Sequence, residues 1–238
     1  MIFNLLLSGG DIISFLISLI ILVPAMMFAL SLHETAHGFV AWKCGDPTAH
    51  NLGRLSLNPL RHLDPVGLVF LLLFGYGWAK PVPVNARYFR NPKWGMAITA
   101  LAGPISNLLF GLICAVLGGT LYGVTFYLGV TGFKSGLLGS LDMISSALYL
   151  SAYINFLYTV FNMIPIPPFD GSRVAFAFLP EKYYFGIMRY ERQIMLGLLI
   201  AMIVLSRIGF SPVNLAAEWL CDQVYIPVAK TVYGALIS

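Results

Sequence analysis

The chain has 238 residues, of which 58% are hydrophobic and only 10% are charged. Soluble domains have roughly 45–50% apolar and about 25% charged residues, so this composition excludes an ordinary water-soluble domain and indicates a protein embedded in lipid. The net charge of +4 is small, and no basic cluster is typical of nucleic-acid binding. Cys44, Cys114 and Cys221 are odd in number and far apart, so we expect neither a disulfide framework nor a cysteine zinc site.

The apolar residues gather in four long stretches, over residues 12–42, 95–117, 144–164 and 194–205. A helix that spans a membrane needs roughly 20 apolar residues, so the first three stretches are long enough and the fourth is borderline. Residues 66–78 are too few to span and predict a segment that dips into the membrane and returns, whereas residues 213–238 predict a last span or an interfacial helix. We therefore expect an all-α polytopic membrane protein with four to six transmembrane helices, forming a single domain over residues 1–238 with its core at about residues 12–180.

The basic residues orient these expected spans. Seven of the 14 Lys and Arg residues lie between the first and second stretches and four between the third and fourth, whereas only Lys134 lies between the second and third. Basic residues mark cytoplasmic loops, so we expect these two basic loops in the cytoplasm and the N-terminus outside. The first ten residues contain no Lys or Arg and no clear cleavage site follows, so we expect the N-terminal stretch to be retained.

The predicted cytoplasmic loop over residues 45–92 contains five dipeptides in which Asp, Asn or Lys precedes proline, and each is a turn signal. Near its end, Val82, Val84 and the residues to Phe89 predict a short extended region. An exposed strand edge at this place would be able to pair with an extended peptide. The alternative is a connector with no role in binding.

The sequence His33-Glu34-Thr35-Ala36-His37 lies within the first apolar stretch. Residues four apart share one face of a helix, so both imidazoles are able to reach one metal ion with Glu34 beside it. Hydrolytic zinc sites use three protein ligands and a water, whose proton Glu34 would accept. An ionisable group inside a span costs roughly 2.5–3.5 kcal/mol, so this group needs a purpose, and a proton relay is the alternative to a metal site.

Asp170 is the best candidate for a third ligand. It follows the third apolar stretch, after the prolines at 165, 167 and 168 that end a helix and impose an extended path. Gly171 then allows a sharp turn that can carry the carboxylate back toward the other spans. The alternative is that Asp170 caps the N-terminus of a helix that begins near Ser172.

The second apolar stretch contains the segment 103–107, with the sequence Gly-Pro-Ile-Ser-Asn. Asn107 would be able to donate hydrogen bonds to a substrate or to the oxyanion of an intermediate. The alternative is a hydrogen bond between helices, which Asn commonly makes inside membranes. Asn162 is open to the same two interpretations.

Together these segments resemble the site-2 protease family of intramembrane zinc metalloproteases. The resemblance rests on residues 33–37, 53–59, 80–85, 103–107 and 162–171, and these segments occur along the chain in the family's order. It implies one zinc ion per chain held by His33, His37 and Asp170, with Glu34 as the catalytic residue. It also implies that Asn107 faces the substrate, and Asn162 is kept as a second candidate substrate contact.

The resemblance further implies cleavage of peptide bonds in or near transmembrane segments of proteins, either regulators or leftover signal peptides. The expected partners are the lipid bilayer and transmembrane proteins or peptides, with no nucleic acid. We expect the cell membrane of a bacterial-type cell, with the site toward the cytoplasmic half. We also expect a compact member, without a PDZ-like insertion or nucleotide-sensing modules. A function of another class, a metal-ion or proton transporter that uses the buried His and Asp residues, is the alternative.

Overall fold

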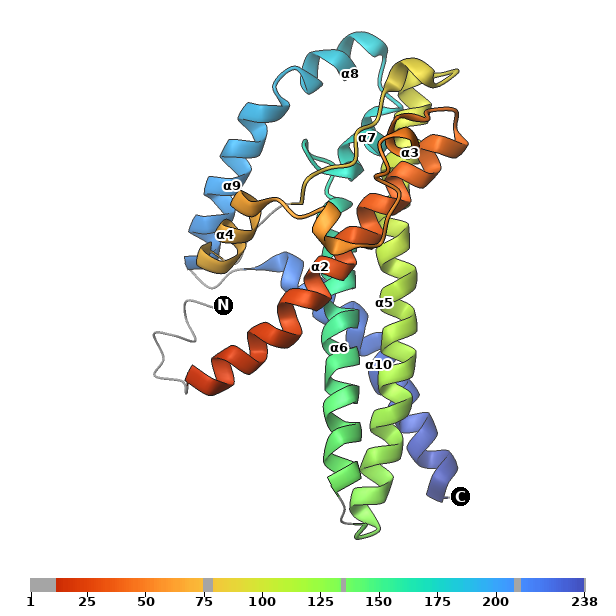
Figure 1. The fold of residues 1–238 in the computed structure, drawn as a ribbon, viewed down its shortest axis with the longest axis vertical. Helices are drawn as coiled ribbons and strands as arrows, with labels where there is room; N and C mark the ends of the chain where they lie inside the picture. The colour runs from red at the N-terminus through yellow and green to blue at the C-terminus, as the bar shows by residue number, and fades with distance from the viewer. Residues whose placement is uncertain (1–11, 75–78, 134–135, 208–210, 238) are drawn as a thin grey trace. The chain divides into compact units, whose positions relative to one another are not determined.

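The computed structural model describes residues 12–74, 79–133, 136–207 and 211–237, and it is all-α over these residues (Figure 1). The α-helices are α2 (Ile12–Lys43), α3 (Thr48–Asn51), α4 (Pro65–Phe74), α5 (Pro92–Val130), α6 (Gly136–Asn162), α7 (Asp170–Phe176), α8 (Glu181–Met188), α9 (Glu191–Arg207) and α10 (Pro212–Ile237). The described residues also form two short 3₁₀-helices, η1 (Pro59–Arg61) and η2 (Ala86–Tyr88). The chain divides into two compact units. Unit 1 comprises residues 1–106 and 161–211, and unit 2 comprises residues 107–160 and 212–238. The expected single domain is not tested by this division and stays a prediction.

Three helices of the described chain are long and apolar enough to cross a membrane. They are Ile20–Lys43 within α2, the whole of α5 and the whole of α6. This finding confirms the all-α membrane class and the first three predicted spans. Helix α9 has only 17 residues and α10 carries the charged residues Glu218, Asp222 and Lys230, so further spans stay predictions.

Helix α5 differs most from its prediction, because it continues to Val130 rather than ending near residue 117. Glycines at 118, 119 and 123 weaken a helix in water, but inside a membrane they allow close approach of neighbouring helices. At 39 residues α5 is about 58 Å long, well beyond the roughly 30 Å of a hydrocarbon core. The connection between α5 and α6 is correspondingly short.

In unit 2, α5 and α6 run side by side to the turn that joins them, and α10 packs against both (Figure 1). The core of this unit consists mostly of small side chains: Cys114, Ala115, Ala152, Phe156, Ala217 and Cys221. The hydroxyl of Ser145 on α6 donates to the carbonyl of Gly118 at 3.0 Å and lies 2.7 Å from the hydroxyl of Tyr225 on α10. Small residues and buried hydroxyls therefore join the three helices, as is usual where helices associate in lipid. All three cysteines are free, as expected.

In unit 1, the loop after α2 folds back along that helix. A Cβ atom added at Gly38 would lie 2.7 Å from Leu55 Cδ2 and 2.9 Å from Val82 Cγ1, so the loop lies directly on the helix at this glycine. The expected dipping segment contains helix α4, which has ten residues, and residues 75–78 lie outside the described chain.

The extended region predicted from Val82 to Phe89 forms no strand in the described residues. Its second half is the 3₁₀-helix η2, and the nearby β-pairing is an isolated bridge between Leu63 and Ala79. The physical reason is that Pro81 and Pro83 lack an N–H group, so this stretch offers too few donors for a ladder.

The close approach of α5 and α10 generates a stability prediction. A Cβ atom at Gly119 would lie 2.6 Å from the backbone oxygen of Tyr225, whereas one at Gly129 of the same helix would meet nothing within 4 Å. We expect Gly119→Ala to lower the stability of the purified protein by roughly 1–3 kcal/mol, because the backbone of α10 must move. Gly129→Ala should leave stability unchanged or slightly raised, since alanine is the better helix former. Thermal unfolding in detergent measures both, and equal midpoints for the two variants would contradict the packing of α10 on α5.

Candidate metal centre

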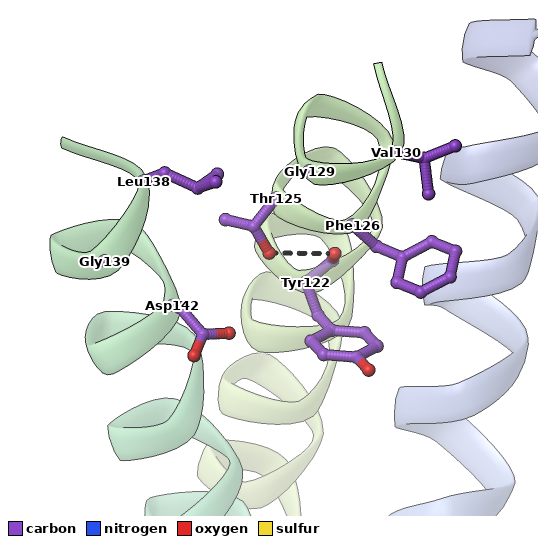
Figure 2. Close-up of a pocket in the computed structure, with 8 residues that line it drawn as sticks. All are labelled: Tyr122, Thr125, Phe126, Gly129, Val130, Leu138, Gly139 and Asp142. Carbon is purple, nitrogen blue, oxygen red and sulfur yellow. Dashed lines mark hydrogen bonds between the residues drawn. The ribbon is translucent and has the colours of Figure 1, made fainter. Parts of the chain in front are cut away.

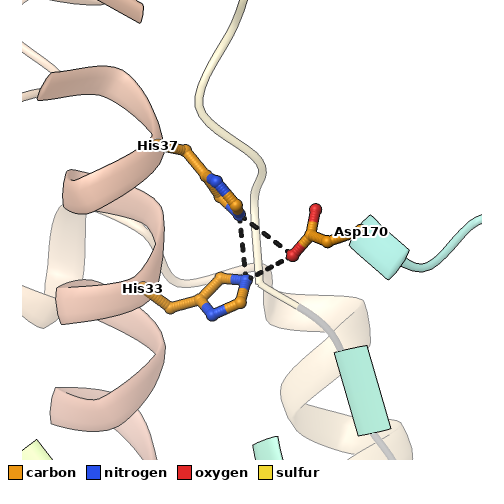
Figure 3. Close-up of side chains that lie close together, drawn as sticks. All are labelled: His33, His37 and Asp170. Carbon is orange, nitrogen blue, oxygen red and sulfur yellow. Dashed lines mark hydrogen bonds and ion pairs between the residues drawn. The ribbon is translucent and has the colours of Figure 1, made fainter. Parts of the chain in front are cut away.

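His33, His37 and Asp170 converge on one point in unit 1 (Figure 3). The two histidines project from one face of α2, and Asp170 is the first residue of α7. The Nε2 atoms of His33 and His37 are 3.0 Å apart. The Oδ2 atom of Asp170 lies 3.1 Å from the Nε2 of His33 and 3.2 Å from that of His37. The structure thus brings together the three side chains that the sequence proposed as ligands.

This triangle fits a zinc ion. Zinc with nitrogen and oxygen ligands at about 2.0–2.2 Å in tetrahedral geometry places those ligands about 3.3–3.6 Å apart, only slightly further than the three atoms lie here. Asp170 Oδ2 is buried, and its partners in the described chain are the two imidazole nitrogens. A carboxylate oxygen in such surroundings needs a cation, and a divalent metal ion would satisfy all three groups at once.

The ring of His37 is oriented by the neighbouring helix. Its Nδ1 atom lies 2.7 Å from the carbonyl oxygen of Thr99 on α5. Because a carbonyl only accepts hydrogen bonds, Nδ1 carries a proton, and Nε2 is the nitrogen that faces Oδ2 of Asp170. Metal-binding histidines are usually fixed in this way through the nitrogen that does not bind the metal.

The segment between α6 and α7 delivers Asp170 to the histidines. Helix α6 ends at Asn162, and the proline-containing residues that follow turn the chain so that α7 begins at Asp170. A Cβ atom at Gly171 would lie 2.3 Å from the carbonyl oxygen of Met163, so only glycine permits this path. The N-cap of α7 is Phe169, with Asp170 already helical. The alternative role of Asp170 as an N-cap is therefore wrong.

The electrostatics of Asp170 suit a metal ligand. Burial alone would raise the pKa of its carboxyl group, but the hydrogen bonds and charges of His33 and His37 outweigh burial and hold that pKa well below its usual range. The carboxyl group is therefore ionised at neutral pH, as a ligand to a metal ion must be.

Gly103 of α5 makes room for the cluster. A Cβ atom at this position would lie 2.5 Å from His33 Cε1 and His37 Nε2, and 2.6 Å from His33 Nε2. Any side chain at 103 would therefore occupy the space in front of both imidazoles. The sequence analysis noted the segment 103–107 for Asn107, whereas the need for glycine at 103 depends on how closely α5 approaches α2.

Glu34 lies on α2 next to His33 and is half-buried. Its Oε2 atom accepts a hydrogen bond of 2.7 Å from the backbone N–H of Val82. Sequence reasoning missed Val82 and Thr99 as neighbours of the cluster, because both contribute backbone groups and such contacts leave no signal in residue type.

The two asparagines lie in different surroundings. Asn107, in unit 2, is fully buried, and its Nδ2 donates to Oδ1 of Asn155 on α6 at 2.8 Å. This bond is the interhelical contact that we gave as the alternative, and the substrate-facing role of Asn107 stays a prediction. Asn162 is the half-buried last residue of α6, in unit 1.

A separate hollow of about 890 Å³ lies in unit 2 where α5 and α6 approach their connection (Figure 2). Its lining is largely apolar and consists of Tyr122, Thr125, Phe126, Gly129, Val130, Leu138, Gly139 and Asp142. Thr125 donates its hydroxyl to the carbonyl of Tyr122 within α5. The lining contains no histidine or cysteine, and Asp142 is its one charged residue.

Comparison with known proteins gives a consistent result. The sequence profile of peptidase family M50 matches residues 15–205. YwhC of Bacillus subtilis, named as a candidate zinc metalloprotease, is 37% identical over 159 residues, which are 67% of this chain and 69% of that protein. Rip2 of Mycolicibacterium smegmatis, with the same kind of name, is 30% identical over 64% of this chain and 54% of its own length. A relative from Methanocaldococcus jannaschii, also so named, is 29% identical over 69% of this chain and 71% of its own length. No solved structure matches the chain significantly.

The position of Gly103 generates a prediction about metal content. We expect Gly103→Ala to weaken zinc binding at least about tenfold, because its methyl group would displace both imidazoles. Gly129→Ala is the matched control on the same helix, and the His33→Ala, His37→Ala double variant sets the level without ligands. Zinc per chain in the purified proteins, measured by elemental analysis against a competing chelator, checks this. Full zinc content in the Gly103→Ala variant would contradict the arrangement of α5 against the histidines.

Proposed function

This chain belongs to peptidase family M50 and is a zinc metalloprotease, and we propose that it hydrolyses peptide bonds within or near the transmembrane segments of other membrane proteins. The observation that carries the proposal is the position of the cluster formed by His33, His37 and Asp170. Two of its three side chains project from α2, a helix that is long and apolar enough to cross a membrane. A site built on such a helix is best placed to meet substrates that are themselves in the bilayer.

We propose that His33, His37 and Asp170 hold the zinc ion, and the convergence of their ligand atoms supports this assignment. When bound, zinc lowers the pKa of a water molecule toward neutrality and polarises the scissile carbonyl. The protein's part is to fix the three ligands. Thr99 orients His37 through its carbonyl, and Gly171 allows the turn that brings Asp170 to the site.

We assign proton transfer to Glu34. Its carboxylate would take the proton from the attacking water and give one to the amine that leaves when the peptide bond breaks. The residue lies beside His33 on the helix that carries both histidine ligands, which keeps it close to the reacting atoms. The hydrogen bond from Val82 occupies only Oε2, so Oε1 is left for the water.

We also propose that two asparagine side chains take part in substrate binding. A transmembrane helix hides its carbonyl groups in hydrogen bonds, so a substrate must unwind locally before its backbone can be attacked. In this proposal Asn107 and Asn162 donate hydrogen bonds to the unwound backbone or to the oxyanion that forms on attack. For Asn107 this requires a change from the hydrogen bond with Asn155, because that bond uses the donor group of its side chain.

We also propose that the site faces the cytoplasmic half of the cell membrane. His33 is ten residues before Lys43, which ends α2, so it lies about 15 Å along the axis from that end. Lys43 begins the most basic loop of the chain, and basic loops stay in the cytoplasm.

The role of Glu34 is tested directly by substitution. We expect Glu34→Ala to bind zinc as the wild type does and to cleave a model transmembrane substrate at least about 100-fold more slowly, because proton transfer loses its acceptor. The measurement is the cleavage rate in detergent or in vesicles, together with the zinc content of the same preparation.

The same assay, run on the wild type, separates the protease from the transporter alternative. A transporter that moves ions through the His and Asp cluster would show flux across vesicles, and wild-type protein would leave the model substrate intact. Cleavage by Glu34→Ala at the wild-type rate would instead retain the protease and exclude Glu34 as its base.

A further inference from the structure

The hydrogen bond between Val82 and Glu34 joins two segments far apart in the chain. The N–H of Val82 donates to Oε2 of Glu34 at 2.7 Å, and the Val82 side chain is 7% exposed. Pro81 and Pro83 on either side have no N–H group, so Val82 supplies the one donor of this three-residue stretch. A single backbone group of the loop thus holds one oxygen of the Glu34 carboxylate.

The backbone around Val82 is held at both ends. On one side, Arg54 donates through Nη2 to the carbonyl of Lys80 at 2.8 Å. On the other side, the N–H of Asn85 donates to Oδ2 of Asp46 at 2.6 Å. Val82 lies two residues from Lys80 and three from Asn85, so loss of either hydrogen bond would change the position of the Val82 N–H.

Asp46 is the unusual member of this arrangement, because its side chain is completely buried. Oδ1 accepts from both the backbone N–H and the hydroxyl of Thr48, and Oδ2 accepts from Asn85. A buried carboxylate is costly and is retained where its hydrogen bonds are needed. Asp46 lies three residues after the end of α2, and its backbone N–H donates to the carbonyl of Ala41 in that helix. It therefore ties the segment that contains Val82 to the helix that carries Glu34.

We propose that Asp46 is a positioning residue for the protease reaction, which holds the Val82 N–H against Glu34 by binding Asn85. The inference rests on the proposed function, because it assigns Glu34 the proton transfer that Asp46 supports. Without the anchor at Asn85, the Val82 donor would move away and Glu34 would adopt other rotamers, so fewer molecules would hold the carboxylate ready for the water. Zinc and its three ligands would be unaffected.

The first test is Asp46→Asn, which keeps the shape of the side chain. It replaces one accepting oxygen by an NH₂ group, which is itself a donor and therefore cannot accept from Thr48 or Asn85. We expect kcat to fall about tenfold or more, with KM and zinc content as in the wild type, because only the base is misplaced. Asp64→Asn is the matched control. Asp64 lies in the same loop and also accepts two backbone hydrogen bonds, from Val66 and Gly67, but these belong to the start of α4. It should keep the wild-type kcat.

The second test removes the donor itself. Replacing the amide between Pro81 and Val82 by an ester, through incorporation of the hydroxy acid that corresponds to valine, deletes the N–H and keeps the side chain. We expect a fall in kcat similar to that of Asp46→Asn. The two changes combined should lower kcat no further than the stronger one alone, since both act through one hydrogen bond.

The outcomes are distinct. If the wild type leaves the model substrate intact, the proposed function fails, and the inference fails with it. If the wild type cleaves, three results would each overturn the role of Asp46. The first is a wild-type kcat in Asp46→Asn, and the second is a combined variant in which the two effects on kcat multiply. The third is a loss of zinc in Asp46→Asn together with a normal kcat in the ester variant. If Asp46→Asn does not fold, an ester in place of the amide between Val84 and Asn85 is used instead, because it removes the N–H that Asp46 Oδ2 binds and leaves Asp46 unchanged. A wild-type kcat in that ester variant would overturn the role of Asp46.

Discussion

The arrangement of the site follows from one constraint: two imidazoles and a carboxylate lie largely out of water and must satisfy one another. His33 and His37 are adjacent because they are one helical turn apart, but Asp170 must be brought from a segment more than a hundred residues away. The atoms that meet are 3.0–3.2 Å apart, close enough to share one divalent ion. The chain around them is arranged to permit this meeting, because each group alone would be unfavourable in an apolar setting.

Much of that arrangement depends on glycine and backbone atoms rather than on reactive side chains. Gly103 lets α5 approach the imidazoles, and Gly171 lets the chain turn tightly past Met163. The carbonyl of Thr99 and the N–H of Val82 orient His37 and Glu34. The hydrogen bonds that orient His37 and Glu34 therefore come from neutral backbone groups, which place no further charge next to the ligands.

Unit 2 reaches stability by a different means. Its helices contact through small side chains and through hydrogen bonds such as the one between Asn107 and Asn155. Between helices in lipid, close packing and hydrogen bonds replace the exclusion of water as the main source of association. The same bond explains why the role of Asn107 cannot be assigned from sequence. An asparagine that joins two helices and an asparagine that binds a substrate are the same type of residue.

The sequence by itself determined the class of the protein, its first three membrane-crossing helices and the set of candidate ligands. Helical periodicity places His33 and His37 on one face whatever surrounds them, and an apolar stretch of sufficient length has few alternatives to a helix in lipid. Only the tertiary structure decided what depends on contacts between distant segments. These include the length of α5, the absence of a strand after Val82 within the described residues, the space that Gly103 provides, and the anchor that Asp46 gives to the neighbour of Glu34. The reason is physical: periodicity and composition act along the chain, whereas close approach and backbone hydrogen bonds depend on which segments fold against each other.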